Sequence, residues 1–260
     1  MIKYRMLAYE ESGHGPPLVL LHAYPLSSQM WEAQRHGLSD ARCVIAPDLP
    51  GFGRSPRLTP PSIAGMASAV LSLLDRLHVR EPVIVGGLSM GGYVAFEILR
   101  QAPDRVRALG LFSTRAGADA PPQREARVKT IEKIQRDGLA PVLEATLPKL
   151  VGKTTLEQRP AVVARVRELM QAQAPEGVAD ALAAMGQRAD SSDLLPGIRV
   201  PTLILAGDED TFIPLDHAQQ MQRQIPGARL DVITEAGHLI NLEQPAAFQD
   251  ALRRWVAGIA

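Results

Sequence analysis

The stretch VIVGGLSMGGYVAFEIL (residues 83–99) places four glycines and one serine between an apolar run and a helical pattern. A glycine-rich turn between a strand and a helix either binds a phosphate or presents a nucleophile. A phosphate loop needs G-x-x-x-x-G-K-[ST] or G-x-G-x-x-G, and neither spacing occurs here. Residues 87–91 (GLSMG) do match G-x-S-x-G, and they predict that Ser89 is a nucleophile on a strained turn.

Apolar runs alternate with helical patterns on both sides of this turn. Near-continuous apolar runs are typical of parallel strands that are buried on both faces. The alternation therefore predicts an α/β fold with a mostly parallel central sheet flanked by helices. We expect strands at 16–22, 41–48, 82–89, 106–113, 201–208 and 228–235, and helices at 62–78, 91–103, 214–226 and 244–258. Residues 3–12 are expected to form a strand of an edge hairpin.

One long region lacks any convincing strand pattern. Residues 116–195 are rich in Ala, Arg, Gln, Glu and Pro, and their flanks have the composition of linkers. We expect helices in this region at 124–138, 139–150, 159–173 and 177–186. The sequence thus predicts a helical cap, residues 116–195, inserted into a core of residues 1–115 and 196–260 and lying over one end of the sheet.

A nucleophilic serine needs a base, and the base needs an orienting acid. On a strand–turn–helix nucleophile the partners follow in the order serine, acid, histidine. LILAGDEDTFIP (203–214) supplies three acids, of which Asp210 is favoured over Asp208 because Asp208 ends the strand and can cap the turn. DVITEAGHLINLEQP (231–245) supplies His238 after the last expected strand.

The oxyanion that forms on an attacked carbonyl needs two hydrogen-bond donors. The backbone N–H of Met90, the residue after the nucleophile, is expected to be one donor. The other is expected in the loop LLHAYPLSSQMW (20–31), where the backbone N–H of Tyr24 is the candidate. We interpret His22, which ends the preceding strand, as structural rather than catalytic.

The overall composition excludes several classes of partner. The chain has 28 basic and 28 acidic residues and no long run of like charge, so neither nucleic acid nor a membrane surface is expected as a partner. With one cysteine it cannot form an internal disulfide. The N-terminus has no apolar signal region, and no apolar run approaches the ~20 residues of a membrane span, so we expect a soluble cytoplasmic protein. Composition carries no signal for the oligomeric state.

Five stretches together resemble the α/β-hydrolase family, in the serine-nucleophile branch with a helical cap. They are LLHAYPLSSQMW (20–31), APDLPGFGRSP (46–56), GGLSMGGYVA (86–95), LILAGDEDTFIP (203–214) and EAGHLINLEQP (235–245). The resemblance implies that Ser89 is the nucleophile, Asp210 the acid and His238 the base. It also implies an oxyanion hole of the Tyr24 and Met90 amides. One departure is Ala23, where the family often has a glycine after the histidine of the oxyanion loop.

These residues and the resemblance lead to a hypothesis about the reaction. We expect hydrolysis of carboxylic esters of small to medium acyl chain through an acyl-enzyme, with a small-molecule ester or lactone as the partner and no cofactor or metal. A lactonase acting on acyl-homoserine or enol lactones is the first alternative. A carbon–carbon bond hydrolase and a cofactor-free perhydrolase would use the same triad. A ligand receptor with a hydrolase fold is the alternative that is not an enzyme.

Overall fold

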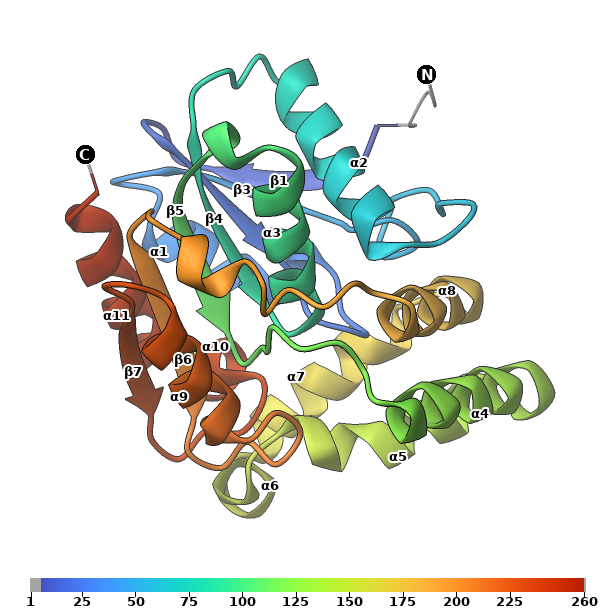
Figure 1. Cartoon of the computed structure of the whole chain (residues 1–260). Coiled ribbons are helices and arrows are strands. Elements are labelled where there is room, and N and C mark those ends of the chain that lie inside the picture. The colour runs from blue at the N-terminus through green and yellow to red at the C-terminus, as the bar shows by residue number, and fades with distance from the viewer. Residues whose placement is uncertain (1–5, 260) are drawn as a thin grey trace.

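The structure is a computed structural model of the chain, and it describes residues 6–259. Seven strands form one sheet in the order β1-β3-β2-β4-β5-β6-β7 (Figure 1). All neighbours in it run parallel except β1 and β3. The strands are β1 (Tyr9–Ser12), β2 (Pro17–Leu21), β3 (Cys43–Pro47), β4 (Val83–Leu88), β5 (Val106–Phe112), β6 (Thr202–Gly207) and β7 (Arg229–Ile233). The predicted α/β fold with a mostly parallel sheet is confirmed.

The first strand lies at an edge of the sheet but does not belong to a hairpin. β1 pairs antiparallel with β3, Tyr9 opposite Pro47, and not with β2, the next strand in the chain. The hairpin expectation is wrong because β2 already has β3 and β4 on its two sides, so the free edge belongs to β3. Residues 3–5 of the predicted strand lie outside the described residues.

Helices cover both faces of the sheet (Figure 1). α2 and α3 pack against each other on one face, and α1 and α11 pack against each other on the opposite face. α2 begins where the Ser62 hydroxyl accepts a hydrogen bond from Gly65 N at 3.0 Å, as a helix cap does. The helices outside the predicted cap are α1 (Glu32–Gly37), α2 (Ile63–Arg76), α3 (Met90–Gln101), α9 (Leu215–Gln224), α10 (Ile240–Glu243) and α11 (Pro245–Ala257).

The region predicted to be a cap consists of helices and lies beyond the carboxyl ends of the strands (Figure 1). It contains no strand between Phe112 and Thr202, all of which the structure describes. Its helices are α4 (Pro121–Asp137), α5 (Ala140–Leu150), α6 (Lys153–Gln158), α7 (Pro160–Gln171) and α8 (Pro175–Gly186). The sequence patterns predicted four of these and missed the short α6. The division into core and cap at residues 116 and 195 stays a prediction.

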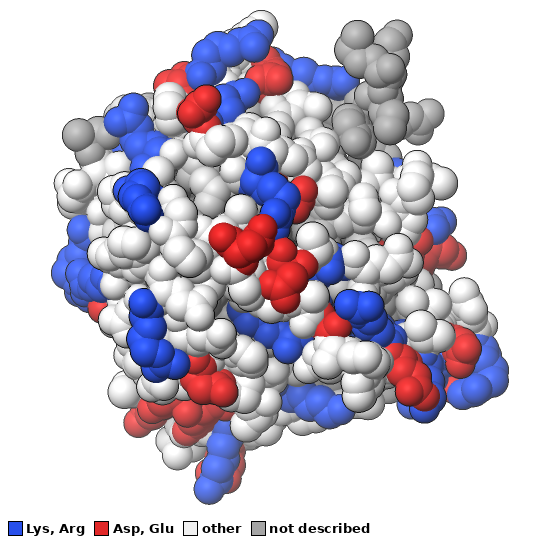
Figure 2. Space-filling model, in the orientation of Figure 1, with Lys and Arg blue, Asp and Glu red and all other residues white. Residues whose placement is uncertain are grey.

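Surface charge and helix length are the two features of the structure that concern nucleic-acid and membrane partners. Basic and acidic side chains are interspersed on the face in Figure 2, without a large area of one sign. Among the described residues, no helix is long and apolar enough to cross a membrane.

Candidate active site

Ser89 sits on the turn between β4 and α3 with a backbone conformation that few residues adopt. Its φ is +53° and its ψ is −112°. A Cβ on Gly87 would lie 2.1 Å from the carbonyl oxygen of Gly91, and a Cβ on Gly91 would lie 2.2 Å from that of Leu21. Neither position therefore tolerates a side chain without a backbone shift. The strained turn that the sequence predicts is present.

The hydroxyl of Ser89 is not used to stabilise the helix that follows it. Ser89 occupies the N-cap of α3 but makes no side-chain cap bond. Its carbonyl oxygen instead accepts from Gly92 N and from Thr114 Oγ1, both at 2.9 Å, which holds the backbone of the turn. The side chain thus remains free for chemistry, in a residue that is 4% exposed.

Asp210 and His238 form a fully buried pair. His238 Nδ1 lies 2.8 Å from Asp210 Oδ2, and both side chains have no exposed surface. The other carboxylate oxygen of Asp210 accepts from the backbone amides of Phe212 and Ile213, each at 2.9 Å. These bonds fix the carboxylate so that it accepts a hydrogen bond from Nδ1–H, which leaves Nε2 as the ring nitrogen that can accept a proton.

His238 Nε2 is buried and has no hydrogen-bond partner among the described residues. The structure therefore brings Asp210 and His238 together but does not place Ser89 in a hydrogen bond with His238. Contacts of this kind are often long in ligand-free sites and shorten when a substrate binds. An orphaned buried nitrogen calls for a functional explanation, and accepting a proton is one.

The two other acids of the same loop make different contacts. Asp208 Oδ1 lies 3.4 Å from Ala236 N, near the end of β6. Glu209 accepts from the backbone amide and the hydroxyl of Thr154 in the cap, and these hydrogen bonds lower the pKa of Glu209. Of the three acids in this segment, Asp210 alone contacts His238.

The two expected oxyanion donors lie on adjacent segments. Gly91 touches Leu21, so the residue before it, Met90, lies beside the end of β2, from which the chain runs on to Tyr24. The first N–H of a helix has no acceptor within the helix. Within residues 6–259 the backbone N–H groups of Tyr24 and Met90 have no acceptor.

His22 orders the oxyanion loop. Its Nδ1 donates to Ala23 O at 3.0 Å, and its Nε2 accepts from Leu49 N at 2.9 Å. Burial lowers the pKa of His22 to about 4, although Ala23 O and the charge of Asp48 act in the opposite direction. The ring is thus neutral and has both nitrogens occupied, which agrees with its interpretation as a structural residue.

Comparisons with known proteins identify the family of this fold. The chain matches the alpha/beta hydrolase fold family over residues 16–245. The chain belongs to the α/β-hydrolase family. A similar solved structure is a thermophilic esterase from Thermogutta terrifontis with malate bound, with 40% identity, a TM-score of 0.94, and coverage of 97% of this chain and 93% of that one.

Two further relatives of this α/β-hydrolase differ in their described activities. The enol-lactonase from Burkholderia xenovorans LB400 is 28% identical with a TM-score of 0.89, and the match covers 96% of each chain. The dihydrolipoyllysine-residue acetyltransferase component of the acetoin cleaving system of Cupriavidus necator is 30% identical over 96% of this chain. The chain spans only 66% of the length of that protein.

Sequence reasoning missed Glu243, a buried residue that holds the His238 loop of this α/β-hydrolase. Glu243 is 2% exposed. It accepts four hydrogen bonds, from Gly152 N (2.7 Å), Thr155 Oγ1 (2.7 Å), Gly237 N (3.0 Å) and Leu239 N (3.1 Å). Two of these donors flank His238, and the other two belong to the cap at the start of α6. The feature of the sequence that could have indicated a buried role for Glu243 is its position at the end of the largely apolar stretch LINLE (239–243).

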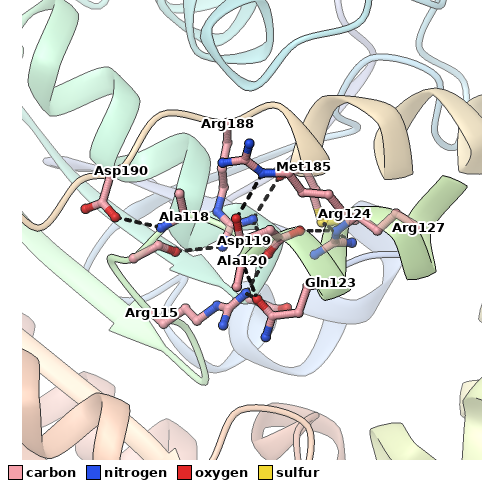
Figure 3. A network of polar contacts seen from close by, with 12 residues as sticks. Arg115, Ala118, Asp119, Ala120, Gln123, Arg124, Arg127, Met185, Arg188 and Asp190 are labelled. Carbon is pink, nitrogen blue, oxygen red and sulfur yellow. Dashed lines mark hydrogen bonds and ion pairs between the residues drawn. The ribbon is translucent and has the colours of Figure 1, made fainter.

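Sequence reasoning also missed a cluster around Asp119 (Figure 3). Its side chain has no exposed surface and pairs with three arginines, Arg115, Arg127 and Arg188. Burial alone would raise the pKa of Asp119, but the hydrogen bonds and charges of Arg127 and Arg188 outweigh it and lower the pKa to about 2. The carboxylate is therefore ionised at neutral pH.

Proposed function

We propose that the chain is a serine hydrolase that cleaves carboxylic esters of small to medium acyl chain. One observation carries the proposal: a buried Asp210–His238 pair leaves Nε2 of the histidine free in the same fold that holds Ser89 on a strained turn. A serine, a base with an available nitrogen and an acid that fixes its tautomer are the three parts of the catalytic triad.

In the proposed reaction, Ser89 Oγ attacks the ester carbonyl carbon while His238 Nε2 takes the hydroxyl proton. The oxyanion accepts hydrogen bonds from the Tyr24 and Met90 amides, each worth about 3 kcal/mol in the transition state. The alcohol leaves with the proton from His238 and an acyl-serine remains. His238 then deprotonates a water, which attacks the acyl carbonyl and releases the acid, and the proton returns to Ser89.

The relatives support this class of reaction without fixing the substrate. Esterases and an enol-lactonase are among the proteins that this chain is similar to. A lactone is a cyclic ester that the same triad would open, so a lactonase is the second candidate.

Labelling with a fluorophosphonate tests the proposal directly. We expect the wild-type chain to be labelled and to hydrolyse p-nitrophenyl butyrate, and we expect Ser89→Ala to lose the label and nearly all turnover. If the Ser89→Ala variant keeps about a tenth of the wild-type turnover, Ser89 is not the nucleophile. A panel of acyl-homoserine and enol lactones beside p-nitrophenyl esters separates the two candidates, since a lactone preference of about tenfold in kcat/KM would favour the lactonase.

A further inference from the structure

The Asp119 cluster, defined as Asp119 with Arg115, Arg127 and Arg188, holds more positive than negative charge (Figure 3). One carboxylate faces three guanidinium groups, so two positive charges are left over. The three arginine side chains are only 12%, 17% and 3% exposed. Adding the neighbours Arg124 and Asp190, which bond to the backbone of the same segment, leaves that surplus as it is.

A surplus of largely buried cations needs an anion. Charges withdrawn from water are costly unless they are paired, and salt screens them only weakly. All three arginines have donors without an acceptor among the described residues, and in Arg188 this donor is the buried Nε. Arg115 bonds only through Nη2, and Arg127 only through Nε and a contact of Nη1 with the Met185 sulfur. Within the described residues, Arg115 Nη1 and Arg127 Nη2 therefore have no acceptor.

Three observations connect the cluster to segments that carry the candidate active site. Arg115 follows Thr114, whose hydroxyl donates to the Ser89 carbonyl. The Arg188 guanidinium lies 4.1 Å from the ring centroid of Tyr93, whose N–H also donates to the Ser89 carbonyl. Arg127 is close enough to the Tyr24 hydroxyl for its charge to oppose the rise in pKa that burial causes there.

A cavity of about 330 Å³ borders the cluster on another side and is a poorer place for an anion. Arg188 and Tyr93 line this cavity, whereas Arg115 and Arg127 do not. The Nη atoms of Arg188 are already bonded to Asp119, Met185 O and Gly117 O. The Nε of Arg188 is buried without a partner in the described part of the chain, so the unused Nη donors of the cluster belong to Arg115 and Arg127.

We propose that the substrate is an ester or lactone that carries a free carboxylate, and that Arg127 and Arg115 bind this carboxylate. The proposal rests on the proposed function and narrows its substrate class. A guanidinium group presents paired donors that match a carboxylate, and such charge-assisted bonds are about twice as strong as neutral ones. Neutral esters of the same size lack the group that would neutralise the surplus charge.

A matched pair of esters tests the proposal. Monomethyl glutarate is a monoanion at about pH 7.5, and dimethyl glutarate presents the same ester carbonyl without the charge. We measure kcat/KM per ester group from methanol release, and we expect the monoanion to be preferred by about tenfold or more. In Arg127→Gln the preference ratio is expected to fall to about one. Arg127→Lys is expected to give an intermediate ratio, because lysine keeps the positive charge but lacks the paired N–H donors of the guanidinium group.

Arg136→Gln is the control, because it removes the same charge from α4, where Arg136 is exposed and pairs with Asp137. This variant is expected to keep the wild-type ratio. Equal use of the two esters by the wild type, or a ratio in Arg127→Gln equal to that of the wild type, would overturn the proposal. If circular dichroism shows that Arg127→Gln is not folded, Arg115→Gln takes its place with the same expected fall.

A direct titration separates this proposal from the proposed function. Calorimetry with glutarate needs no turnover, and we expect binding to the wild type and about tenfold weaker binding to Arg127→Gln. If neither ester is hydrolysed and no fluorophosphonate label appears, the proposed function fails while glutarate binding still supports the carboxylate site. If hydrolysis of neutral esters proceeds and glutarate does not bind, the carboxylate proposal fails alone.

Discussion

Glu243 Oε2 accepts a hydrogen bond from the backbone N–H of Gly152 at 2.7 Å, which ties the loop of His238 to the beginning of α6 in the cap. The same oxygen accepts from Gly237 N at 3.0 Å. The two backbones are in close contact, since a Cβ on Gly237 would lie 2.2 Å from Gly152 N. The predicted cap therefore contributes to holding the loop that carries His238.

Glu243→Gln should damage catalysis more than substrate binding. The amide group presents an NH₂ to donors that now face a carboxylate oxygen, and each buried donor left without an acceptor costs about 1–3 kcal/mol. We expect kcat to fall by about ten- to a hundredfold with a smaller change in KM, since the misplaced group is the base. Steady-state kinetics and urea unfolding provide both readouts.

Glu235→Gln is the matched control, because Glu235 lies in the same loop and its side chain is 61% exposed in a pair with Arg159. We expect it to change the unfolding free energy by less than about 1 kcal/mol and to leave kcat near the wild-type value. If both variants lower kcat equally, the positioning role of Glu243 is wrong.

Asp210→Asn and Asp208→Asn distinguish the two carboxylates of one loop. An asparagine at 210 no longer fixes the tautomer of His238, and a loss of this kind lowers kcat by about 10⁴-fold in a serine protease triad. Asp208 makes only a long contact with Ala236 N, so its replacement should cost less than about tenfold. Kinetics with p-nitrophenyl butyrate decide, and the opposite ranking would assign the acid to Asp208.

The sequence was most informative where local chemistry decides the structure. Strands β2, β4 and β6 are buried along their whole length, so their apolar runs stood out. The turn at Ser89 could be predicted because the five residues of G-x-S-x-G include the small residues that such a turn needs on both sides of the serine. Asp210 could be preferred to Asp208 because the two lie at different points of the same turn.

What the sequence could not predict depends on contacts between distant segments. The pairing of β1 with β3 follows from which strand edge stays free, and no residue of β1 encodes this. Glu243 obtains two of its donors from residues about 90 positions away, and those two are a backbone amide and a threonine hydroxyl. The Asp119 cluster joins Arg115, which directly precedes the predicted cap, to Arg188, which lies near the end of the cap.

Gly91→Ala tests the steric requirement of the turn. The new Cβ would lie 2.2 Å from the carbonyl oxygen of Leu21, so the turn or β2 must shift. We expect a loss of about 2–4 kcal/mol in the free energy of unfolding, together with a large fall in kcat because the shift moves Ser89 and Met90. Gly197→Ala is the control, since no atom lies within 4 Å of its Cβ position. It should be neutral or slightly stabilising in the same urea titration, and equal losses in the two variants would contradict the steric account.

His22 gives a prediction about stability and pH. Burial lowers its pKa from 6.5 to about 4 in the folded chain, whereas in the unfolded chain it takes up a proton near pH 6.5. Between these two values the unfolded state binds more protons, so the folded state loses stability as the pH falls from 6.5 towards 4. A shift of this size corresponds to a full effect of roughly 3 kcal/mol.

Unfolding free energies of the wild type and of His22→Gln, measured from neutral pH down to about pH 4, check this dependence. Glutamine can donate to Ala23 O and accept from Leu49 N, as His22 does, but it does not titrate. We therefore expect the unfolding free energy of the wild type to fall relative to that of His22→Gln as the pH falls through this range. The control His36→Gln, at an exposed position, is expected to show the same dependence of unfolding free energy on pH as the wild type. A difference between wild type and His22→Gln that stays constant with pH would show that His22 is not held neutral in the folded chain.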